Sequence, residues 1–276
     1  MQHPKVSVIV PNYNHGPYLA QRLESILNQT YNDLELLILD DASTDDSHRI
    51  LTSYYSKPRV RVVVNTANSG AAFPQWNRGI YLAKGEYVWI AESDDSADPH
   101  FLETLVPLLD HTPSLGLAYC KSRLINKAGV KIGDSLNWTE DLDRERWKFD
   151  FINNGREEIR NYLIYKNTIP NASAVITRRS VLNKVLPVDT SFQLCGDWLH
   201  WGKVLLQTDL AYVSEPLNHW RLESSNSRAS QAGVLEWAEG QRVIPYLAKE
   251  LKTPEFETNE LLMGFAERCL NWSVAS

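Results

Sequence analysis

The stretch Tyr87-Val88-Trp89-Ile90-Ala91-Glu92-Ser93-Asp94-Asp95-Ser96 decides the fold class of this chain. Its first five residues are apolar and rich in aromatic and β-branched types, which predicts a short buried strand. Asp94 and Asp95 follow where that strand leaves the core, and two adjacent carboxylates repel each other. A hard divalent cation that also binds the phosphates of a ligand would relieve the repulsion. The structural alternative is a strand-to-helix turn, in which Asp98 and Pro99 begin the next helix.

Two other predicted strands end in polar residues in the same way. Residues 6–10 lead into Pro11-Asn12-Tyr13-Asn14-His15-Gly16, and residues 34–39 lead into Asp40-Asp41-Ala42-Ser43-Thr44-Asp45. A helical pattern follows each strand, and such alternation predicts a mostly parallel sheet with helices on both faces. The carboxyl ends of parallel strands meet along one crevice, where ligands bind. The sequence therefore predicts an α/β fold with polar residues from three strands gathered at one site.

The alternation of strands and helices extends to about residue 124, and then the pattern changes. Between residues 125 and 154 the periodicity fades and the charge rises, which predicts a mobile excursion beside the site or a solvated linker. Helical patterns return at residues 155–165, 180–185 and 197–206, with a short strand at 173–177. After residue 228 the chain is helical in pattern to its last residue, so we expect that it is a piece of a longer protein.

The composition excludes several classes of protein. A net charge of −6 argues against a nucleic-acid partner, for which a basic face would be expected. The sequence contains no apolar run near the roughly 20 residues of a membrane span and no signal-peptide pattern, which favours a cytoplasmic protein. Its three cysteines lack metal-type spacing and fit a reducing compartment.

Six short motifs, in order, resemble the inverting glycosyltransferases of family 2, whose catalytic domain has the GT-A fold. They are Val6 to Asn14, Ser25 to Tyr31, Asp40 to Asp45, Asn68-Ser69-Gly70 with Asn77-Arg78-Gly79, Ala83 to Tyr87, and Ser93-Asp94-Asp95. The resemblance covers roughly residues 5–125 and is thinner to about 228. It implies a GT-A domain at 1–228, with a nucleotide-binding half (1–124) and an acceptor-side half (125–228), followed by a helical extension at 229–276.

The resemblance also assigns roles to the acidic strand ends. Pro11 and Tyr13 lie where family members hold the nucleotide base, and Asp41 matches the carboxylate that accepts the ring N–H of the base. Asp94 matches the residue near the ribose, and Asp95 matches the ligand of Mn²⁺ or Mg²⁺. As a Lewis acid, the metal would stabilise the departing diphosphate. A packed turn for Tyr13 and a solvated helix cap for Asp41 are the structural alternatives.

Further residues are assigned with less direct matches. Asn68 and Trp76 are expected to contact the nucleotide sugar, although many relatives have Arg in place of Trp76. Asp197 matches the general base of the family, and the alternative is that it caps its helix. His219 is a second candidate to contact the metal or a phosphate, with packing as the alternative.

Three further positions depart from the family pattern. Glu92 replaces a common Asp, Gly196 replaces a common Glu, and Glu223 stands where a His is often found. The loss of Glu at 196 removes one candidate for acceptor binding.

The sequence therefore favours an inverting glycosyltransferase. It would use a nucleotide-diphosphate sugar, with UDP favoured by family frequency. A glycan, polysaccharide or lipid-linked acceptor is expected, with peripheral association at the inner face of the membrane as an option. The alternative is a catalytically weak nucleotide- or carbohydrate-binding module of a larger glycan-assembly protein. A dinucleotide-binding oxidoreductase is disfavoured, because no Gly-x-Gly-x-x-Gly follows the first strand.

Overall fold

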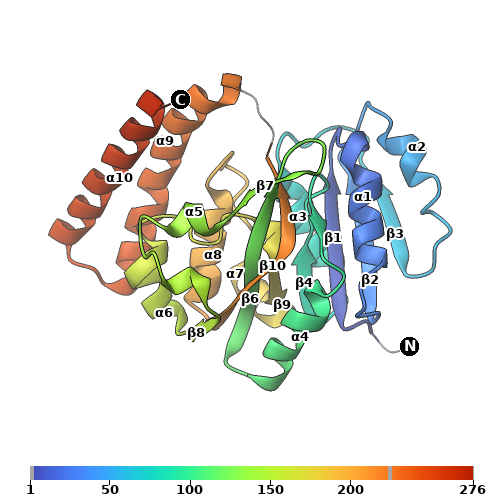
Figure 1. The fold of residues 1–276 in the computed structure, drawn as a ribbon, viewed down its shortest axis with the longest axis horizontal. Coiled ribbons are helices and arrows are strands. Elements are labelled where there is room, and N and C mark those ends of the chain that lie inside the picture. The colour runs from blue at the N-terminus through green and yellow to red at the C-terminus, as the bar shows by residue number, and fades with distance from the viewer. Residues whose placement is uncertain (1–2, 223–225, 276) are drawn as a thin grey trace.

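The computed structural model of the chain describes residues 3–222 and 226–275, with only the backbone described at 226–232 and 270–275. Its centre is one ten-stranded sheet in the order β3-β2-β1-β4-β9-β6-β10-β5, with β7 paired to β6 and β8 paired to β10 (Figure 1). The strands are β1 (Val6–Asn12), β2 (Leu34–Asp40), β3 (Val60–Val64), β4 (Tyr87–Ile90), β5 (Ser96–Ala97), β6 (Leu115–Ile125), β7 (Lys131–Asp134), β8 (Phe151–Asn153), β9 (Val175–Arg178) and β10 (Asp209–Arg221).

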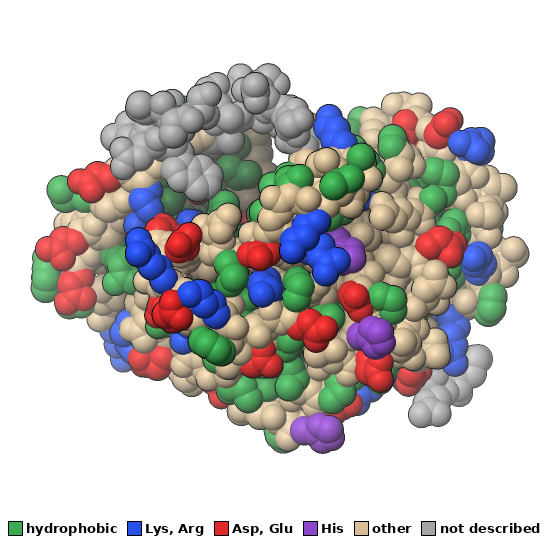
Figure 2. Space-filling model, viewed as in Figure 1, with side chains coloured by type: hydrophobic (Ala, Val, Ile, Leu, Met, Phe, Trp, Pro, Cys, Tyr) green, Lys and Arg blue, Asp and Glu red, His purple; other side chains and the backbone are tan. Residues whose placement is uncertain are grey.

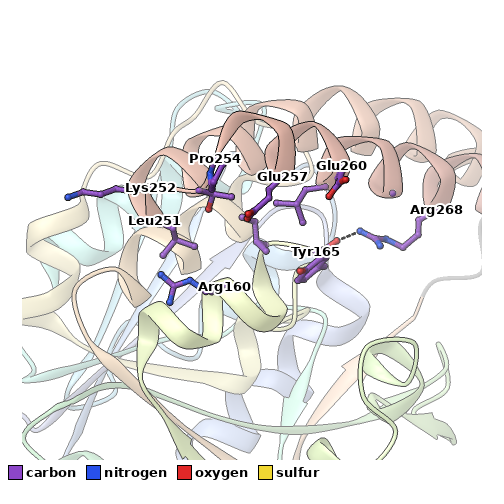
Figure 3. Close-up of a pocket in the computed structure, with 12 residues that line it drawn as sticks. Arg160, Tyr165, Leu251, Lys252, Pro254, Glu257, Glu260 and Arg268 are labelled. Carbon is purple, nitrogen blue, oxygen red and sulfur yellow. Dashed lines mark hydrogen bonds between the residues drawn. The ribbon is translucent and has the colours of Figure 1, made fainter.

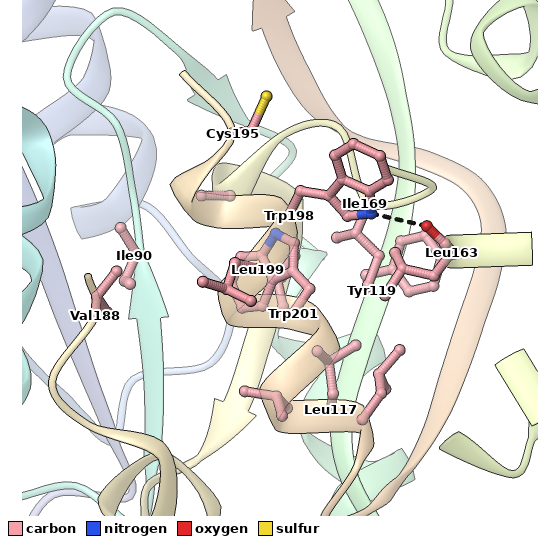
Figure 4. Close-up of a cluster of buried hydrophobic side chains, with 14 of the residues drawn as sticks. Ile90, Leu117, Tyr119, Leu163, Ile169, Val188, Cys195, Trp198, Leu199 and Trp201 are labelled. Atoms are coloured by element: carbon pink, nitrogen blue, oxygen red, sulfur yellow. Dashed lines mark hydrogen bonds between the residues drawn. The ribbon is translucent and has the colours of Figure 1, made fainter. Parts of the chain in front are cut away.

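Helices cover both faces of the sheet and enclose two hydrophobic cores. One core contains α1 (Gly16–Leu27), α2 (Ser47–Leu51) and α4 (Phe101–His111). The other contains α3 (Ala72–Leu82), α7 (Arg179–Val185), α8 (Gly196–Leu205), α9 (Asn226–Leu251) and α10 (Glu255–Ala275). Figure 4 shows part of this second core, where Trp198 and Trp201 of α8 lie among aliphatic side chains of the sheet.

The central strands are apolar throughout because both of their faces are buried. In β1, Val6, Val8 and Val10 enter the first core, while Ile9 enters the second. Strands buried on both faces lose the alternation of polar and apolar residues that marks a half-exposed strand. β1 pairs in parallel with β2 and with β4, and β2 pairs in parallel with β3. The predicted α/β fold with a parallel first half and C-terminal helices is therefore confirmed.

The second half of the sheet departs from the simple alternating pattern. β9 runs antiparallel between β4 and β6, so the sheet is mixed. The 13-residue strand β10 was not anticipated, because Pro216 and several polar residues interrupt its pattern. β10 pairs in parallel with β6, and its register shifts on both sides of Pro216. This strand brings Arg221 to the end of β4, where the acidic pair lies.

The 125–154 segment is folded rather than a loose excursion, which corrects the prediction. It forms β7, α5 (Leu136–Thr139), η1 (Arg146–Lys148) and β8, and it leads into α6 (Gly155–Glu158) and the π-helical turn η2 (Ile159–Leu163). Trp147 is 3% exposed and donates its indole N–H to Tyr119 Oη at 2.9 Å. The segment is therefore folded through short elements and the buried side chain of Trp147, and elements this short leave no periodicity in the sequence.

The pair α9 and α10 packs against α8 at one end of the molecule (Figure 1). Close approach is possible because small residues lie at the contacts. A Cβ added at Gly240 would lie 2.1 Å from the ring of Phe265, and one added at Gly202 would lie 2.5 Å from Leu247. Within the described ranges, no helix is long and apolar enough to cross a membrane.

Substitution of Gly79 tests the contact between α3 and β1. A Cβ at Gly79 would lie 2.4 Å from Ile9 Cγ2, a branched side chain with little freedom to move. We expect Gly79→Ala to lower the free energy of unfolding by about 1–3 kcal/mol, although alanine is the better helix former. Gly264→Ala in α10 is the matched control, because nothing lies within 4 Å of its added Cβ. It should raise stability by about 0.5–1 kcal/mol. Equal effects in urea unfolding would contradict this packing.

Candidate functional site

A cleft of about 240 Å³ lies at the carboxyl edge of the sheet. It is formed by the ends of β1, β2 and β4 and by the loop before α3. Its lining residues are Pro11, Asn12, Tyr13, His15, Asp41, Asn68, Gly70, Ala71, Ala72, Gln75, Glu92 and Ser93. Four residues that the sequence predicts for nucleotide binding, Pro11, Tyr13, Asp41 and Asn68, thus lie together. His15 and Gln75 were not anticipated, although His15 belongs to the polar stretch that ends β1.

Asp41 is held rigidly in the wall of this cleft. Its Oδ1 accepts hydrogen bonds from Asn65 Nδ2 at 2.6 Å and Gln75 Nε2 at 2.7 Å. Its Oδ2 accepts from the backbone N–H and the hydroxyl of Ser69, at 2.9 and 2.7 Å. A carboxylate fixed on two sides presents its charge at a constant place and orientation. Asp41 is therefore not a solvated helix cap, because it is buried and ties the end of β2 to the loop before α3.

Asp40, the neighbour of Asp41, has a structural role. It is fully buried, and it accepts hydrogen bonds from Asn12 Nδ2 and Ser43 Oγ, at 2.7 and 2.6 Å. Asn14 and Ala42 have φ angles of 54° and 61°, a left-handed conformation that costs non-glycine residues energy. Asn14 Oδ1 also accepts from the backbone N–H of Thr44 at 2.7 Å. The loops after β1 and β2, which carry the lining residues Tyr13 and Asp41, are thereby joined.

Tyr13 is the most accessible aromatic group of the cleft. Its side chain is 45% exposed, although tyrosine usually buries much of its ring. A flat ring at the edge of a polar cleft offers a stacking face to another flat ring.

Three carboxylates, those of Glu92, Asp94 and Asp95, follow the end of β4. Asp94 is partly exposed, and its carboxylate accepts no hydrogen bond from the part of the chain that the structure describes. Asp95 is 1% exposed. Its Oδ1 accepts from the backbone N–H of Arg221 at 2.8 Å, and its Oδ2 accepts from Asn171 Nδ2 at 2.9 Å. The two members of the acidic pair therefore differ. The carboxylate of Asp94 is open, in the sense that it is partly exposed and accepts none of the hydrogen bonds described, whereas that of Asp95 is buried and fixed.

Glu92 and Asp95 resist ionisation because they are desolvated and lie near the charge of Asp94. Burial, and then the charge of Asp94, raise the pKa of Asp95 to about 6. Burial and the charge of Asp94 raise the pKa of Glu92 to about 8, while a hydrogen bond from Trp76 acts in the opposite direction. A divalent cation near such a cluster would favour its ionised form.

A buried cation, Arg22 of α1, lies within the electrostatic influence of these carboxylates. Its side chain is fully buried and its guanidinium lies 5.0 Å from the ring centroid of Trp89. None of its three guanidinium nitrogens has a hydrogen-bond partner among the described residues. Burial lowers the pKa of Arg22 to about 10, and the charges of Asp95, Asp94 and Glu92 oppose that shift. A charged residue on the apolar stripe of its helix, between Leu19 and Leu23, is the sequence signal that could have revealed it.

Besides the acidic pair and Asp197, two further predicted site residues, Trp76 and His219, do not line the cleft. Trp76 is 3% exposed and packs in the second core, against Phe73. It reaches the site only through its indole N–H, which donates to Glu92 Oε1 at 2.8 Å. His219 of β10 lies opposite Ser96, with its Nδ1 3.3 Å from Ser96 Oγ. Burial lowers the pKa of His219.

The predicted base, Asp197, lies in the first turn of α8. Its Oδ2 accepts from Asn167 Nδ2 at 3.0 Å, and its Oδ1 accepts from the backbone N–H of Trp198 at 2.7 Å. Burial raises its pKa from 3.8 to about 7, near the value at which a general base works best at neutral pH. Glu223, another acidic residue noted in the sequence, lies outside the described residues.

The absence of a side chain at Gly196 is explained by the packing of α8 on α3. A Cβ at Gly196 would lie 2.5 Å from the ring of Phe73. Phe73 follows Ala71 and Ala72, which line the cleft. The start of α8, which carries Asp197, therefore packs directly beside the wall of the cleft.

The residues present suit a hard divalent cation held in part by a ligand. No group of three or more His, Cys, Asp or Glu side chains in the described ranges could hold a metal by itself. Mg²⁺ and similar ions are commonly bound by one or two carboxylates together with the phosphates of a substrate. The open carboxylate of Asp94, next to the cleft, offers oxygen ligands of this type.

A larger hollow of about 610 Å³ lies elsewhere, between α9, α10 and η2. Figure 3 shows that Arg160, Lys252, Glu257, Glu260 and Arg268 surround it. Arg268 donates to the backbone oxygen of Tyr165, and Arg160 is paired with Glu157. None of the predicted site residues lines this hollow. On the face drawn in Figure 2, acidic and basic side chains are intermixed.

Comparison with known proteins agrees with this geometry. The family model described as glycosyl transferase family 2 matches residues 7–186. Over 136 residues the chain is 38% identical to the chondroitin synthase of Escherichia coli. This match covers 49% of the chain and 20% of the synthase. The chain thus spans a fifth of the length of this relative.

Two solved structures share the fold over nearly the whole chain. TarS of S. aureus in complex with UDP-GlcNAc has a TM-score of 0.71 at 21% identity, covering 99% of this chain and 74% of that one. The mannosyltransferase PcManGT of Pyrobaculum calidifontis, in complex with GDP-Man and Mn²⁺, has a TM-score of 0.63 at 19% identity. That match covers 100% of this chain and 76% of the other. The sheet and helices described above are therefore those of a GT-A fold.

Replacement of Asp197 tests its raised pKa through stability. The folded protein holds the proton of the Asp197 carboxyl more tightly than the unfolded chain does, so low pH favours the folded state. The folded state loses this stabilisation as the pH rises from 3.8, the ordinary pKa of an aspartate, to about 7, the pKa of Asp197 in the folded protein. We expect Asp197→Asn to be more stable than the wild type at pH 8 by on the order of 1–2 kcal/mol, and to show no gain near pH 4.

Asp189→Asn is the control for that measurement, because it should act in the opposite direction. Hydrogen bonds from Ser191 lower the pKa of Asp189, so its carboxylate supports the fold above the pKa of the unfolded chain. Chemical unfolding of both variants at the two pH values gives the comparison. A gain for Asp197→Asn that is independent of pH would contradict the raised pKa.

Proposed function

Since the chain belongs to glycosyl transferase family 2, we propose that it is an inverting glycosyltransferase that moves a sugar from a nucleotide-diphosphate donor to an acceptor hydroxyl. The observation that carries the proposal is the cleft at the sheet edge. Its lining includes an aromatic ring of the size of a base, Tyr13, and a fixed carboxylate, Asp41, and the open carboxylate of Asp94 follows its lining residue Ser93. A UDP-sugar is the donor proposed, and the UDP-GlcNAc complex of a protein with this fold supports that choice.

In this proposal, the nucleotide lies across the ends of β1 and β2. The ring of Tyr13 stacks on the base beside Pro11, and Asp41 accepts the ring N–H. The two oxygens of Asp41 already accept four hydrogen bonds, from Asn65, Gln75 and Ser69, which is about the number that a carboxylate can accept. In this proposal the ring N–H replaces the hydroxyl of Ser69, which is free to rotate. Asn68 lies at the rim of the same cleft. Trp76 is assigned a supporting role, because its indole holds Glu92 and does not face the donor.

Asp94 and Asp95 are the proposed holders of Mn²⁺ or Mg²⁺. The open carboxylate of Asp94 is suited to direct contact, and the hydrogen bonds from Asn171 and Arg221 hold Asp95 in place next to it in the chain. When bound, the cation acts as a Lewis acid on the diphosphate leaving group. The Mn²⁺ complex of PcManGT supports this choice of metal. His219 is the remaining candidate, and its lowered pKa keeps its ring neutral and able to act as a ligand.

Asp197 is the proposed general base. Inversion by direct displacement requires one group to take the proton of the acceptor hydroxyl as the new bond forms. The pKa of about 7 leaves a large share of Asp197 ionised at neutral pH, and it still holds a proton well. The hydrogen bonds from Asn167 and from the backbone N–H of Trp198 orient the two carboxylate oxygens, and each oxygen keeps a further lone pair for the acceptor.

The acceptor is proposed to be a glycan, a polysaccharide or a lipid-linked sugar. Chondroitin synthase, similar over half of this chain, is named for making a polysaccharide. A cytoplasmic site of action, at the inner face of the membrane when the acceptor is lipid-linked, belongs to the same proposal. So does the division into a GT-A domain at 1–228 and a helical extension at 229–276.

Donor turnover with acidic-pair variants tests the proposal. The wild type, incubated with a panel of nucleotide sugars and Mn²⁺ or Mg²⁺, should release nucleoside diphosphate from a UDP-sugar. A chelator should abolish the release. Asp94→Asn and Asp95→Asn should lower turnover by on the order of 10²–10⁴, because charge at the leaving group is then poorly compensated. Asp98→Asn, which removes a nearby carboxylate bound to His100, is the matched control and should retain turnover.

The same assay distinguishes the alternative. A protein that binds UDP but turns over no donor in the panel would be a nucleotide-binding module, the function that the missing Glu at 196 would favour. Turnover that persists in excess chelator would contradict the metal assignment.

Asp197→Asn separates catalysis from helix capping. The amide is close in size to the carboxylate and can still cap a helix, but it cannot take a proton. Transfer should fall by on the order of 10²–10⁴ while the affinity for UDP, measured by calorimetry, stays the same. Asp189→Asn serves again as the control. Near-normal transfer by Asp197→Asn would overturn its assignment as the base.

A further inference from the structure

Glu239 of α9 binds the loop that leads into α8. Its side chain is 5% exposed. Its Oε1 accepts from the backbone N–H of Gln193 at 2.7 Å, and its Oε2 accepts from those of Leu194 and Cys195, at 3.0 and 2.6 Å. No lysine or arginine in the described ranges forms an ion pair with it. Three consecutive backbone amides therefore compensate the buried charge.

These three amides lie immediately before the candidate base. Cys195 is the residue that precedes α8, and Asp197 is the second residue of that helix. Free backbone N–H groups near a helix start form a weak positive end, which a carboxylate stabilises. Glu239 supplies that carboxylate from a distant part of the chain, 44 residues beyond Cys195.

The rest of α8 is held from the same side. The ring of Trp198 lies 5.5 Å from that of Phe265 in α10, and Gly202 lies against Leu247 in α9. On its other side, Gly196 packs on Phe73 of α3. The helix that carries Asp197 is thus clamped between the wall of the cleft and the C-terminal helices.

We infer that Glu239 is a positioning residue, which fixes Asp197 for proton transfer by holding the loop at residues 193–195. The inference rests on the proposed function, because it assigns Glu239 a part in the same reaction. It makes α9 a component of the working site and not only an extension that follows it. The donor cleft does not depend on this contact, since its lining residues all lie between Pro11 and Ser93.

The charge of Glu239 also acts on Asp197. The described groups that influence this carboxylate are the amide of Asn167, the backbone of Trp198, the thiol of Cys195 and the carboxylate of Glu239. Burial is the main cause of the raised pKa of Asp197, and the negative charge of Glu239 adds to it in the same direction. Loss of that charge should lower the pKa.

Glu239→Gln in the full chain tests the inference. One carboxylate oxygen becomes an N–H₂ group that faces backbone N–H donors, so the loop loses part of its anchor. With the UDP-sugar that the wild type uses, kcat should fall by about 10- to 100-fold, as expected for a base displaced by a fraction of an ångström. The KM for the donor and the affinity for UDP should stay within about twofold. The acidic limb of the pH–rate profile should move to lower pH, because the negative charge that adds to the raised pKa of Asp197 is lost.

Glu236→Gln is the matched control, one turn earlier on α9. Its backbone oxygen, and not its carboxylate, contacts Cys195. It should keep the wild-type kcat. If Glu239→Gln fails to fold, Glu239→Asp keeps the charge on a shorter side chain, and it should show the same fall in kcat with unchanged UDP affinity.

The possible failures can be told apart. A wild type without transfer from any donor overturns the proposed function. A wild type that transfers sugar, together with a folded Glu239 variant of equal kcat, overturns only the positioning role. An equal loss of kcat and of UDP affinity would also overturn it, because the damage would then extend to the donor cleft.

Discussion

The repulsion among three carboxylates at the end of β4 is the constraint that organises this edge of the sheet. Each compensating group comes from a different element. The cation of Arg22 comes from α1, the N–H of Arg221 comes from β10, and the indole of Trp76 comes from α3. The acidic site is therefore complete only when α1, α3 and both halves of the sheet are in place. Its chemistry and its fold cannot be separated into independent parts.

Arg22 shows what this arrangement costs. A guanidinium buried without hydrogen bonds is unfavourable, because the interior replaces water with few polar partners. The nearby negative charges and the face of Trp89 offset part of that cost. Buried charges retained without a full set of partners are common at functional sites, where stability is given up for electrostatic effect. The same holds for Asp197, whose burial weakens the folded state at neutral pH and suits it to accept a proton.

The features that could be predicted from sequence are those encoded locally. The apolar strands β1 and β2 and the polar residues at their ends are adjacent in the chain, so Pro11, Tyr13 and Asp41 could be placed together from the topology of parallel sheets. The prediction for Asn68, in the loop after β3, rests on the family resemblance. The burial of Trp76 was within reach as well. Phe73, Trp76 and Ile80 recur at helical spacing and mark the buried stripe of α3. The family resemblance favours a ligand role at this position, whereas the periodicity of α3 predicts burial.

The features that were missed depend on contacts between distant parts of the chain. β10 contains a proline and alternates irregularly, and its pairing with β6 across a register shift defines it more than its composition does. Arg221 meets Asp95 over a separation of 126 residues, and Glu239 meets Cys195 over 44. No periodicity links such pairs, so only the folded arrangement reveals them.

The bond between Glu239 and the loop before α8 has a consequence for the order of events during biosynthesis. Chains fold as they leave the ribosome, with N-terminal parts first. The residues of the donor cleft emerge early and lie in the parallel part of the sheet. The loop at 193–195 receives its anchor only after α9 has been made and has docked. A nascent chain can thus shape its nucleotide cleft well before the acceptor side is set, and maturation of the site ends with the docking of a helix.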